Sequence, residues 1–181
     1  FVVSILLIAQ TNAQVSAKMF QYPDVSKSQI VFTYGGDVWI ASKTGGTAYK
    51  LTSAKGIETF ARFSPDGSQI AFTGNYDGNQ DVYVMPSMGG LPKRITYHGM
   101  SDRLIDWYPD GKSLLFASTR ESGKQRFSQF YKISKDGGIA EKLPLPYAEF
   151  GSVSPDGKKI AFTILTRMFR TWKRYRGGMA A

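Results

Sequence analysis

The chain contains no cysteine and only one histidine, His98, among its 181 residues. Without cysteine it can form no disulfide and carry no lipid anchor on a thiol. A hydrolytic triad within this stretch would have to use His98, which lies in a loop with no Gly-x-Ser-x-Gly motif beside it. Most loop histidines have no chemical role. We therefore expect no catalytic residue and no cofactor in these residues.

Long apolar runs are also missing. The first nine residues are apolar apart from Ser4, but they are too few to span a bilayer, which takes about 20 apolar residues. Small and polar residues follow, so we interpret residues 1–13 as a partial signal peptide whose start is missing, cleaved after Ala13 or, as the alternative, after Ala17. A buried first strand is the competing interpretation. The signal peptide predicts a periplasmic or secreted protein.

Glycine and aromatic residues, by contrast, are abundant. The chain has 19 glycines, and aromatic residues make up 14% of it. An all-β protein uses aromatic residues in its strands and glycines in its turns. The composition therefore favours an all-β fold.

A Pro-Asp-Gly motif followed by a short apolar run occurs three times, beginning at Pro65, Pro109 and Pro155. We interpret Pro23-Asp24 as a degenerate first copy. The four prolines are 42, 44 and 46 residues apart, which fits propeller blades of about 40 to 50 residues. Pro presets φ, Asp bonds back to the backbone and Gly accepts a positive φ, so each copy predicts a tight turn between two strands. The apolar run predicts a strand covered on both faces.

A second repeated unit, a strand followed by a Gly-Gly turn, lies between the Pro-Asp turns and reaches its glycines at Gly45, Gly89 and Gly137. The short, partly charged segments after the glycines suit exposed outer strands. The predicted strands are 29–33, 37–42 and 48–52, then 59–63, 69–73, 81–85 and 93–96, then 103–107, 113–118, 127–134 and 141–143, and finally 149–153 and 158–164. These units predict a β-propeller fragment of about three and a half four-stranded antiparallel blades. Residues 14–181 would be the N-terminal part of a propeller domain, truncated within the fourth blade.

Asp77 and Asp81 belong to a segment that resembles the start of a calcium-binding loop. The segment lacks the glycine of the sixth position, where Val82 stands, and the glutamate of the twelfth, where Met88 stands. The alternative is a polar hairpin loop whose last aspartate accepts backbone hydrogen bonds ahead of a strand. We favour the loop and expect no metal site.

The segment 166–181 is basic, with interleaved aromatic residues and no acidic residue. Nucleic-acid binding is one interpretation, although an exported protein rarely meets nucleic acid, and an idle solvated loop is another. We favour a cluster that receives a carboxylate, because guanidinium groups bind such anions bidentately. The candidate substrate-binding residues are Arg167, Arg170, Lys173, Arg174 and Arg176.

Three longer motifs carry a family resemblance. They are residues 32–40, residues 72–79 leading into 82–86, and residues 169–178. The Pro-Asp-Gly repeats alone resemble the six-bladed propellers of TolB and its relatives. Together with the three motifs they resemble the N-terminal propeller of bacterial tricorn protease homologues, over almost everything after residue 13.

The resemblance implies a large secreted or periplasmic serine peptidase with two propellers, a PDZ-like domain and a catalytic domain whose residues lie beyond position 181. It implies a non-catalytic propeller that guides peptide substrates or products to or from that domain. The alternative is a TolB-like propeller acting as a periplasmic protein-binding module. The expected partners are the downstream domains, peptide substrates and, as an option, further copies in a homo-oligomer. Neither nucleic acid nor, after signal cleavage, a membrane is expected as a partner.

Overall fold

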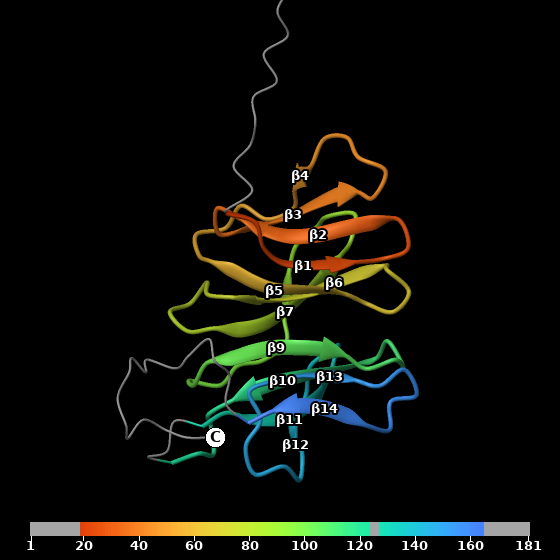
Figure 1. Cartoon of the computed structure of the whole chain (residues 1–181). Coiled ribbons are helices and arrows are strands. Elements are labelled where there is room, and N and C mark those ends of the chain that lie inside the picture. The colour runs from red at the N-terminus through yellow and green to blue at the C-terminus, as the bar shows by residue number, and fades with distance from the viewer. Residues whose placement is uncertain (1–18, 124–126, 165–181) are drawn as a thin grey trace, which may run out of the picture.

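The computed structural model describes residues 19–123 and 127–164, and the fourteen elements found there are all β-strands (Figure 1). Three sheets have four strands each and a fourth has two, and every pairing is antiparallel. In these two ranges there is no helix of the length and apolar character that crossing a membrane requires. The all-β prediction is confirmed.

Within each sheet the strands lie side by side in chain order. The first sheet contains β1 (Gln21–Val25), β2 (Gln29–Tyr34), β3 (Asp37–Ser42) and β4 (Tyr49–Lys50). The second contains β5 (Glu58–Phe63), β6 (Gln69–Gly74), β7 (Asp81–Pro86) and β8 (Lys93–Arg94). The third contains β9 (Asp102–Trp107), β10 (Ser113–Ser118), β11 (Gln129–Ser134) and β12 (Glu141–Lys142). The fourth contains β13 (Phe150–Val153) and β14 (Ile160–Thr163).

The first strands of the four sheets contact one another in succession: β1 contacts β5, β5 contacts β9 and β9 contacts β13. Figure 1 shows the sheets stacked in this order from the red strands to the blue ones. Face-to-face stacking of four-stranded meanders by their first strands is the arrangement of propeller blades around an axis. The predicted three blades and inner half of a fourth are therefore present, and we call the first strands the inner strands.

The turn chemistry predicted from the repeats is confirmed. Gly67, Gly111 and Gly157 have φ of +73°, +61° and +71°, where only glycine is free of a steric penalty. In the first of these turns, the hydroxyls of Ser64 and Ser68 donate to the Asp66 carboxylate at 2.5 and 2.7 Å. These two bonds hold the pKa of Asp66 at about 2. The Pro-Asp-Gly sequence thus builds a rigid reversal between the first two strands of a blade.

The interpretation of Pro23-Asp24 as a degenerate turn is wrong. Both residues lie within β1, and the reversal to β2 is made at Ser26, whose backbone N–H donates to the Gln29 carbonyl at 2.9 Å. Ser64 makes the same bond to Gln69 in the next blade. The Pro-Asp pair matches only two residues of the motif, and without the glycine it forms no turn but lies at a bulge within β1. The first blade consequently has the inner strand that the sequence did not reveal.

The hydrophobic core lies between successive blades rather than within one sheet. Val31 and Ile40 of the first blade are buried against Phe72 of the second, and Val84 of the second is buried with Trp107 of the third. The middle strands β6 and β10 are buried along nearly their whole length, as their apolar runs predicted. Complete burial of one such side chain contributes about 1.5 to 3 kcal/mol.

The corresponding run of the fourth blade behaves differently. Ala161 and Phe162 of β14 are exposed, because the structure describes no sheet on the far side of that strand. The outer strands are also shorter than expected, with two residues each, and β11 starts at Gln129 rather than at residue 127. Edge strands of two residues offer little unpaired backbone to another chain.

Candidate functional site on the propeller axis

The inner strands line an open hollow of about 710 Å³ at the end where they enter their turns. All four blades contribute to its wall. Its inner-strand residues include Asp24, Val25, Arg62, Phe63, Ile105, Asp106, Trp107, Gly151, Ser152 and Val153. Polar backbone and side-chain groups line it beside apolar ones, so it suits a ligand that also mixes the two, such as a peptide.

Two aspartates in this wall tie the first blade to the second and the third to the fourth. Asp24 accepts the backbone N–H of Phe63 at 2.8 Å, and Asp106 accepts the backbone N–H of Val153 at 3.0 Å. Asp106 also accepts the Ser152 hydroxyl at 2.9 Å. Both carboxylates thus use oxygen atoms to satisfy backbone donors of a neighbouring strand. Their role is to set the spacing of the inner strands.

Arg62 of the second blade also lines the hollow. Its Nη1 donates to the Pro23 carbonyl at 3.3 Å and lies 3.9 Å from the Asp24 carboxylate. The Arg62 carbonyl accepts the indole N–H of Trp107 at 3.1 Å, which joins the second blade to the third. About a third of the Arg62 side chain remains exposed. Its guanidinium therefore contributes free donor capacity to the hollow.

A cluster of three aromatic rings and an arginine lies further back along the same strands. It consists of Tyr22, Phe60, Arg103 and Phe150, one residue from each inner strand, and we call it the axial collar. The Tyr22 and Phe60 ring centroids are 4.1 Å apart, and those of Phe60 and Phe150 are 5.8 Å apart. The Arg103 guanidinium lies 4.2 Å from the Phe150 ring centroid and 5.5 Å from that of Phe60. The four side chains form one connected cluster.

Two collar residues have a strained backbone. Tyr22 and Phe60 have φ of +51° and +55°, a region that residues with a Cβ rarely occupy. Each lies where the pairing of its inner strand to the second strand shifts register. Strain of this kind costs about 1 to 3 kcal/mol per residue and persists only where the surroundings impose it. The bulges that place these two rings in the collar are thus maintained at an energetic cost.

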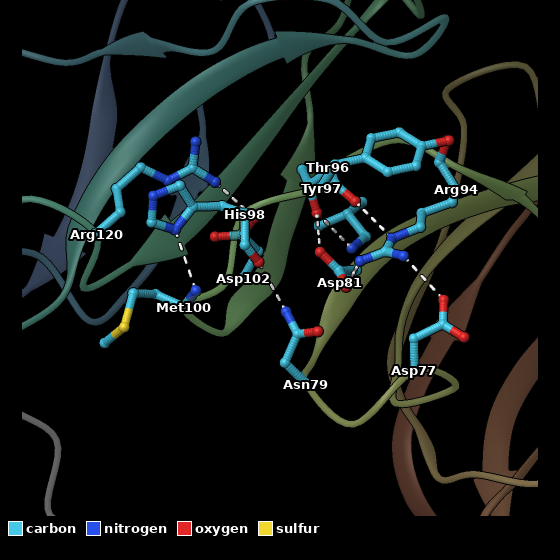
Figure 2. A network of polar contacts seen from close by, with 11 residues as sticks. Asp77, Asn79, Asp81, Arg94, Thr96, Tyr97, His98, Met100, Asp102 and Arg120 are labelled. Carbon is cyan, nitrogen blue, oxygen red and sulfur yellow. Dashed lines mark hydrogen bonds and ion pairs between the residues drawn. The ribbon is translucent and has the colours of Figure 1, made fainter.

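The segment first compared with a calcium loop is occupied by an arginine. Arg94 donates to Asp81 at 2.6 Å and to Asp77 at 2.8 Å, so a cation side chain stands between the two carboxylates (Figure 2). Thr96 donates its hydroxyl to Asp81 at 3.1 Å and accepts the Val82 N–H at 3.0 Å. Asp81 was expected to accept backbone hydrogen bonds; its donors are side chains instead. Burial raises the pKa of the Asp81 carboxyl against the opposing effects of Thr96 and Arg94.

Two of the inner strands, β5 and β9, begin with a buried acidic residue, a feature that sequence reasoning missed. Glu58 begins β5 and Asp102 begins β9, and both are fully buried. Asp102 accepts Arg120 Nη2 at 2.5 Å, and Glu58 accepts the Thr52 hydroxyl at 2.9 Å. Burial raises the pKa of the Glu58 carboxyl above its usual 4.5. An acid at the first position of both β5 and β9 was the available signal.

The remaining sequence candidates lie apart from the axis. His98 is exposed, and its Nδ1 accepts the backbone N–H of Met100 at 3.1 Å (Figure 2). The amide of Asn79 donates to the His98 carbonyl at 2.8 Å, so the histidine belongs to the loop between the second and third blades. The candidate cluster Arg167, Arg170, Lys173, Arg174 and Arg176 lies outside the described residues, as does the predicted signal peptide at 1–13.

Four-stranded antiparallel blades around a hollow axis define this chain as a β-propeller. Residues 17–181 match the family model of the tricorn protease N-terminal beta propeller domain. The chain therefore belongs to the family of tricorn N-terminal propellers, and the resemblance inferred from its motifs is confirmed.

Among curated relatives, the chain is 33% identical over 162 residues to "Tricorn protease homolog 1" of Streptomyces coelicolor, a match that covers 88% of this chain and 15% of that protein. It is 29% identical over 167 residues to "Putative Tricorn-like protease N-terminal subunit" of Sulfurisphaera tokodaii, covering 88% of this chain and 82% of the relative. The chain thus spans a small part of one relative and most of the other.

Solved structures agree on the fold. The structure of a putative TolB from Agrobacterium tumefaciens has a TM-score of 0.72 at 24% identity and covers 81% of this chain and 54% of its own. The crystal structure of the tricorn protease has a TM-score of 0.66 at 26% identity and covers 77% of this chain and 14% of its own. The TolB likeness shows the propeller fold, and the family match identifies the chain as the tricorn type.

Proposed function

We propose that this chain is the non-catalytic propeller of a secreted or periplasmic tricorn-like serine peptidase. Its axis would guide peptide substrates or products to or from a downstream catalytic domain of the same chain. The observation that supports this best is the hollow of about 710 Å³, to which the inner strands of all four blades contribute. The names of the relatives, which are tricorn proteases and their subunits, support the peptidase context.

Obstruction of the hollow tests the guiding role. Val25 lines the hollow and is 60% exposed, so Val25→Trp adds bulk there without replacing a buried side chain. In the full-length protein we expect it to slow the cleavage of long unstructured peptides. Ile139→Trp is the matched control, because Ile139 is 97% exposed on an outer turn. Equal rates for the two variants would contradict passage along the axis.

The alternative function, a TolB-like module that binds a partner protein, predicts a different outcome. Such a module would capture a protein partner without any peptidase domain downstream. The full-length protein would then hydrolyse no peptide, and Val25→Trp would have no turnover to affect. Peptide hydrolysis that is lost when a downstream serine is replaced would support the peptidase.

The basic cluster is proposed to contact a peptide carboxylate. Replacing Arg170, Arg174 and Arg176 by Ala should weaken cleavage of free-carboxylate peptides more than that of amidated ones, since each charged hydrogen bond contributes about 1.5 to 3 kcal/mol. Lysine substitutions should restore only part of the effect, because lysine lacks the planar fork. Equal losses on both peptides would leave the cluster without this role.

The proposed export has its own test. N-terminal sequencing of the mature protein should find a new terminus just after Ala13. A mature protein that still contains Phe1 would contradict cleavage at this place. This result would leave the peptide passage untouched, because the inner strands begin beyond the cleavage site.

A further inference from the structure

We infer that Asp77 is a site of spontaneous isomerisation, at which the Asp77-Gly78 step rearranges to isoaspartate through a cyclic imide. The chain contains five Asp-Gly steps, which begin at Asp66, Asp77, Asp110, Asp136 and Asp156. Glycine has no side chain to shield its backbone nitrogen, so an Asp-Gly step is especially prone to this reaction. The structure singles out one of the five. The inference is independent of the proposed passage of peptides.

The rearrangement needs no reactant other than water. The Gly78 nitrogen attacks Cγ of the protonated Asp77 carboxyl, the N–Cγ bond forms, and the nitrogen's proton leaves with the carboxyl OH as water. A water then adds to the former backbone carbonyl carbon of Asp77, and the bond from that carbon to the Gly78 nitrogen breaks. The chain afterwards runs through Cγ, and the former backbone carbonyl is a free carboxylate. The reaction therefore requires that the glycine nitrogen can approach Cγ.

The other four steps are held in hydrogen-bonded turns. Their glycine N–H groups each donate to the carbonyl three residues earlier, at 2.8 to 3.0 Å, and belong to Gly67, Gly111, Gly137 and Gly157. Such a bond directs the N–H away from the aspartate side chain and fixes the backbone around it. The Pro-Asp-Gly turns hold the carboxylate as well. Asp110, for example, accepts the backbone N–H groups of Lys112 and Ser113 at 2.8 and 3.0 Å. At these steps the turn must open before the nitrogen can attack.

The Asp77-Gly78 step lies in a bend between β6 and β7 and not in a hydrogen-bonded turn. Among the residues that the structure describes, none accepts a hydrogen bond from the Gly78 N–H. Gly78 has φ of +95°, and a Cβ added there would meet no atom within 4 Å, so the space around the step is open. The Asp77 side chain is 64% exposed. The nitrogen and the carboxyl can therefore meet without local unfolding.

Arg94 restrains the Asp77 carboxylate. Its Nη1 donates to Asp77 at 2.8 Å, at the exposed end of the network in Figure 2. The cation favours the ionised carboxylate, which resists the attack, but an ion pair this exposed opens readily. Rearrangement moves the carboxylate to a different carbon and lengthens the backbone by one methylene, so this ion pair loses its geometry. Arg94 keeps its bond to the buried Asp81 at 2.6 Å. The modification thus releases the loop from β8 and leaves the buried pair in place.

Asparagine variants test the assignment, because asparagine forms the same imide with loss of ammonia and reacts faster than aspartate. Asp77→Asn is compared in the full-length protein with Asp136→Asn, the matched control. The Asp136 side chain is 71% exposed, slightly more than that of Asp77, but the N–H of its glycine donates to the Ser134 carbonyl at 3.0 Å. We expect deamidation at position 77 to be faster by about fivefold or more, the factor by which one hydrogen bond keeps a turn closed. Mass spectrometry of tryptic peptides measures both rates.

The same measurement in urea separates the effect of the structure from that of the sequence. In the unfolded protein the two variants should deamidate at equal rates, since both asparagines precede a glycine. Equal rates in the folded protein, or a faster reaction at position 136, would overturn the inference, because exposure alone would then decide the rate. A difference that persists unchanged in urea would overturn it as well, because neighbouring residues would then be the cause.

The parent protein provides a second readout. After prolonged incubation of the full-length protein, enzymatic methylation of isoaspartate followed by peptide mapping locates the modified positions. We expect isoaspartate at Asp77 before it appears at any of the other four Asp-Gly steps. Its first appearance at one of those steps would contradict the assignment.

Discussion

The indole N–H of Trp107 donates a hydrogen bond to the backbone carbonyl of Arg62, 3.1 Å away in the neighbouring blade. Trp107 is 4% exposed and also belongs to the core between the second and third blades. The Trp107 side chain thus provides both apolar packing and a hydrogen bond between two inner strands. The bond lies at the wall of the hollow, where both residues contribute to the lining.

Trp107→Phe should lower the free energy of unfolding of the propeller by about 1 to 3 kcal/mol, because it removes the hydrogen bond between the blades and part of a buried ring. Trp39→Phe is the matched control. The Trp39 indole makes a bond of equal length, to the Tyr34 carbonyl, but within one sheet and at a less buried position. Urea denaturation of the full-length protein compares the two. A larger loss for Trp39→Phe would contradict the importance of the tie between blades.

Arg94→Leu should be strongly destabilising. It leaves the fully buried Asp81 carboxylate without its cation, and breaking a buried ion pair in this way costs about 3 to 5 kcal/mol. Asp77→Asn removes the other partner of the same guanidinium, but Asp77 is 64% exposed, so its loss should cost about 1 kcal/mol or less. Thermal melting distinguishes the two variants. Similar melting temperatures would show that Asp81 is not held by Arg94.

Gly67→Val and Gly111→Val should each destabilise the protein by about 1 to 2 kcal/mol, because a β-branched residue must adopt φ near +70° or +60°. At Gly67 an added Cβ would meet the Ser26 Cβ only at 3.4 Å, so backbone strain rather than a collision sets the cost. Asn79→Ala, in the loop between β6 and β7, is the mild control, because it removes an exposed hydrogen bond to the His98 carbonyl. Melting temperatures that do not differ among the three variants would refute the role of the turn glycines.

Glu58→Gln should change the pH dependence of stability. Burial raises the pKa of Glu58 above 4.5, so the folded state holds its proton more tightly than the unfolded state. The contribution of Glu58 is complete below pH 4.5 and is lost as the pH rises through the higher folded value. The variant, which cannot ionise, should therefore lose less stability than the parent as the pH rises above 4.5. Parallel curves of melting temperature against pH would contradict the raised pKa.

Local chemistry explains what could be predicted from the sequence. The Pro-Asp-Gly and Gly-Gly turns depend on residues adjacent in the chain, and Gly67 and Gly137 have the positive φ that their motifs required. Strand positions followed from these turns. Dependence on short local motifs also explains the wrong interpretation of Pro23-Asp24 as a turn. The pair matches two residues of the motif but lies within strand β1.

Long-range relationships could not be predicted in this way. Arg94 and Asp81 are 13 residues apart, and Arg103 and Glu149 are 46 apart. The first pair depends on the register of β8 against β7 within one blade, and the second on how the third and fourth blades pack, and no motif encodes either. The collar needs one side chain from each of four blades, and its residues differ in type, so it leaves no repeated pattern in the sequence.

The ties between inner strands each span about one repeat: 39 residues from Asp24 to Phe63, 45 from Arg62 to Trp107 and 47 from Asp106 to Val153. Each blade therefore finds its docking partner in the segment synthesised just before it. A chain emerging from the ribosome could add one blade at a time onto a template already in place, in the manner of other repeat architectures. A substitution that breaks one tie, such as Asp24→Ala, would then delay the docking of the second blade onto the first. The apolar face between these two blades would stay exposed to solvent during synthesis.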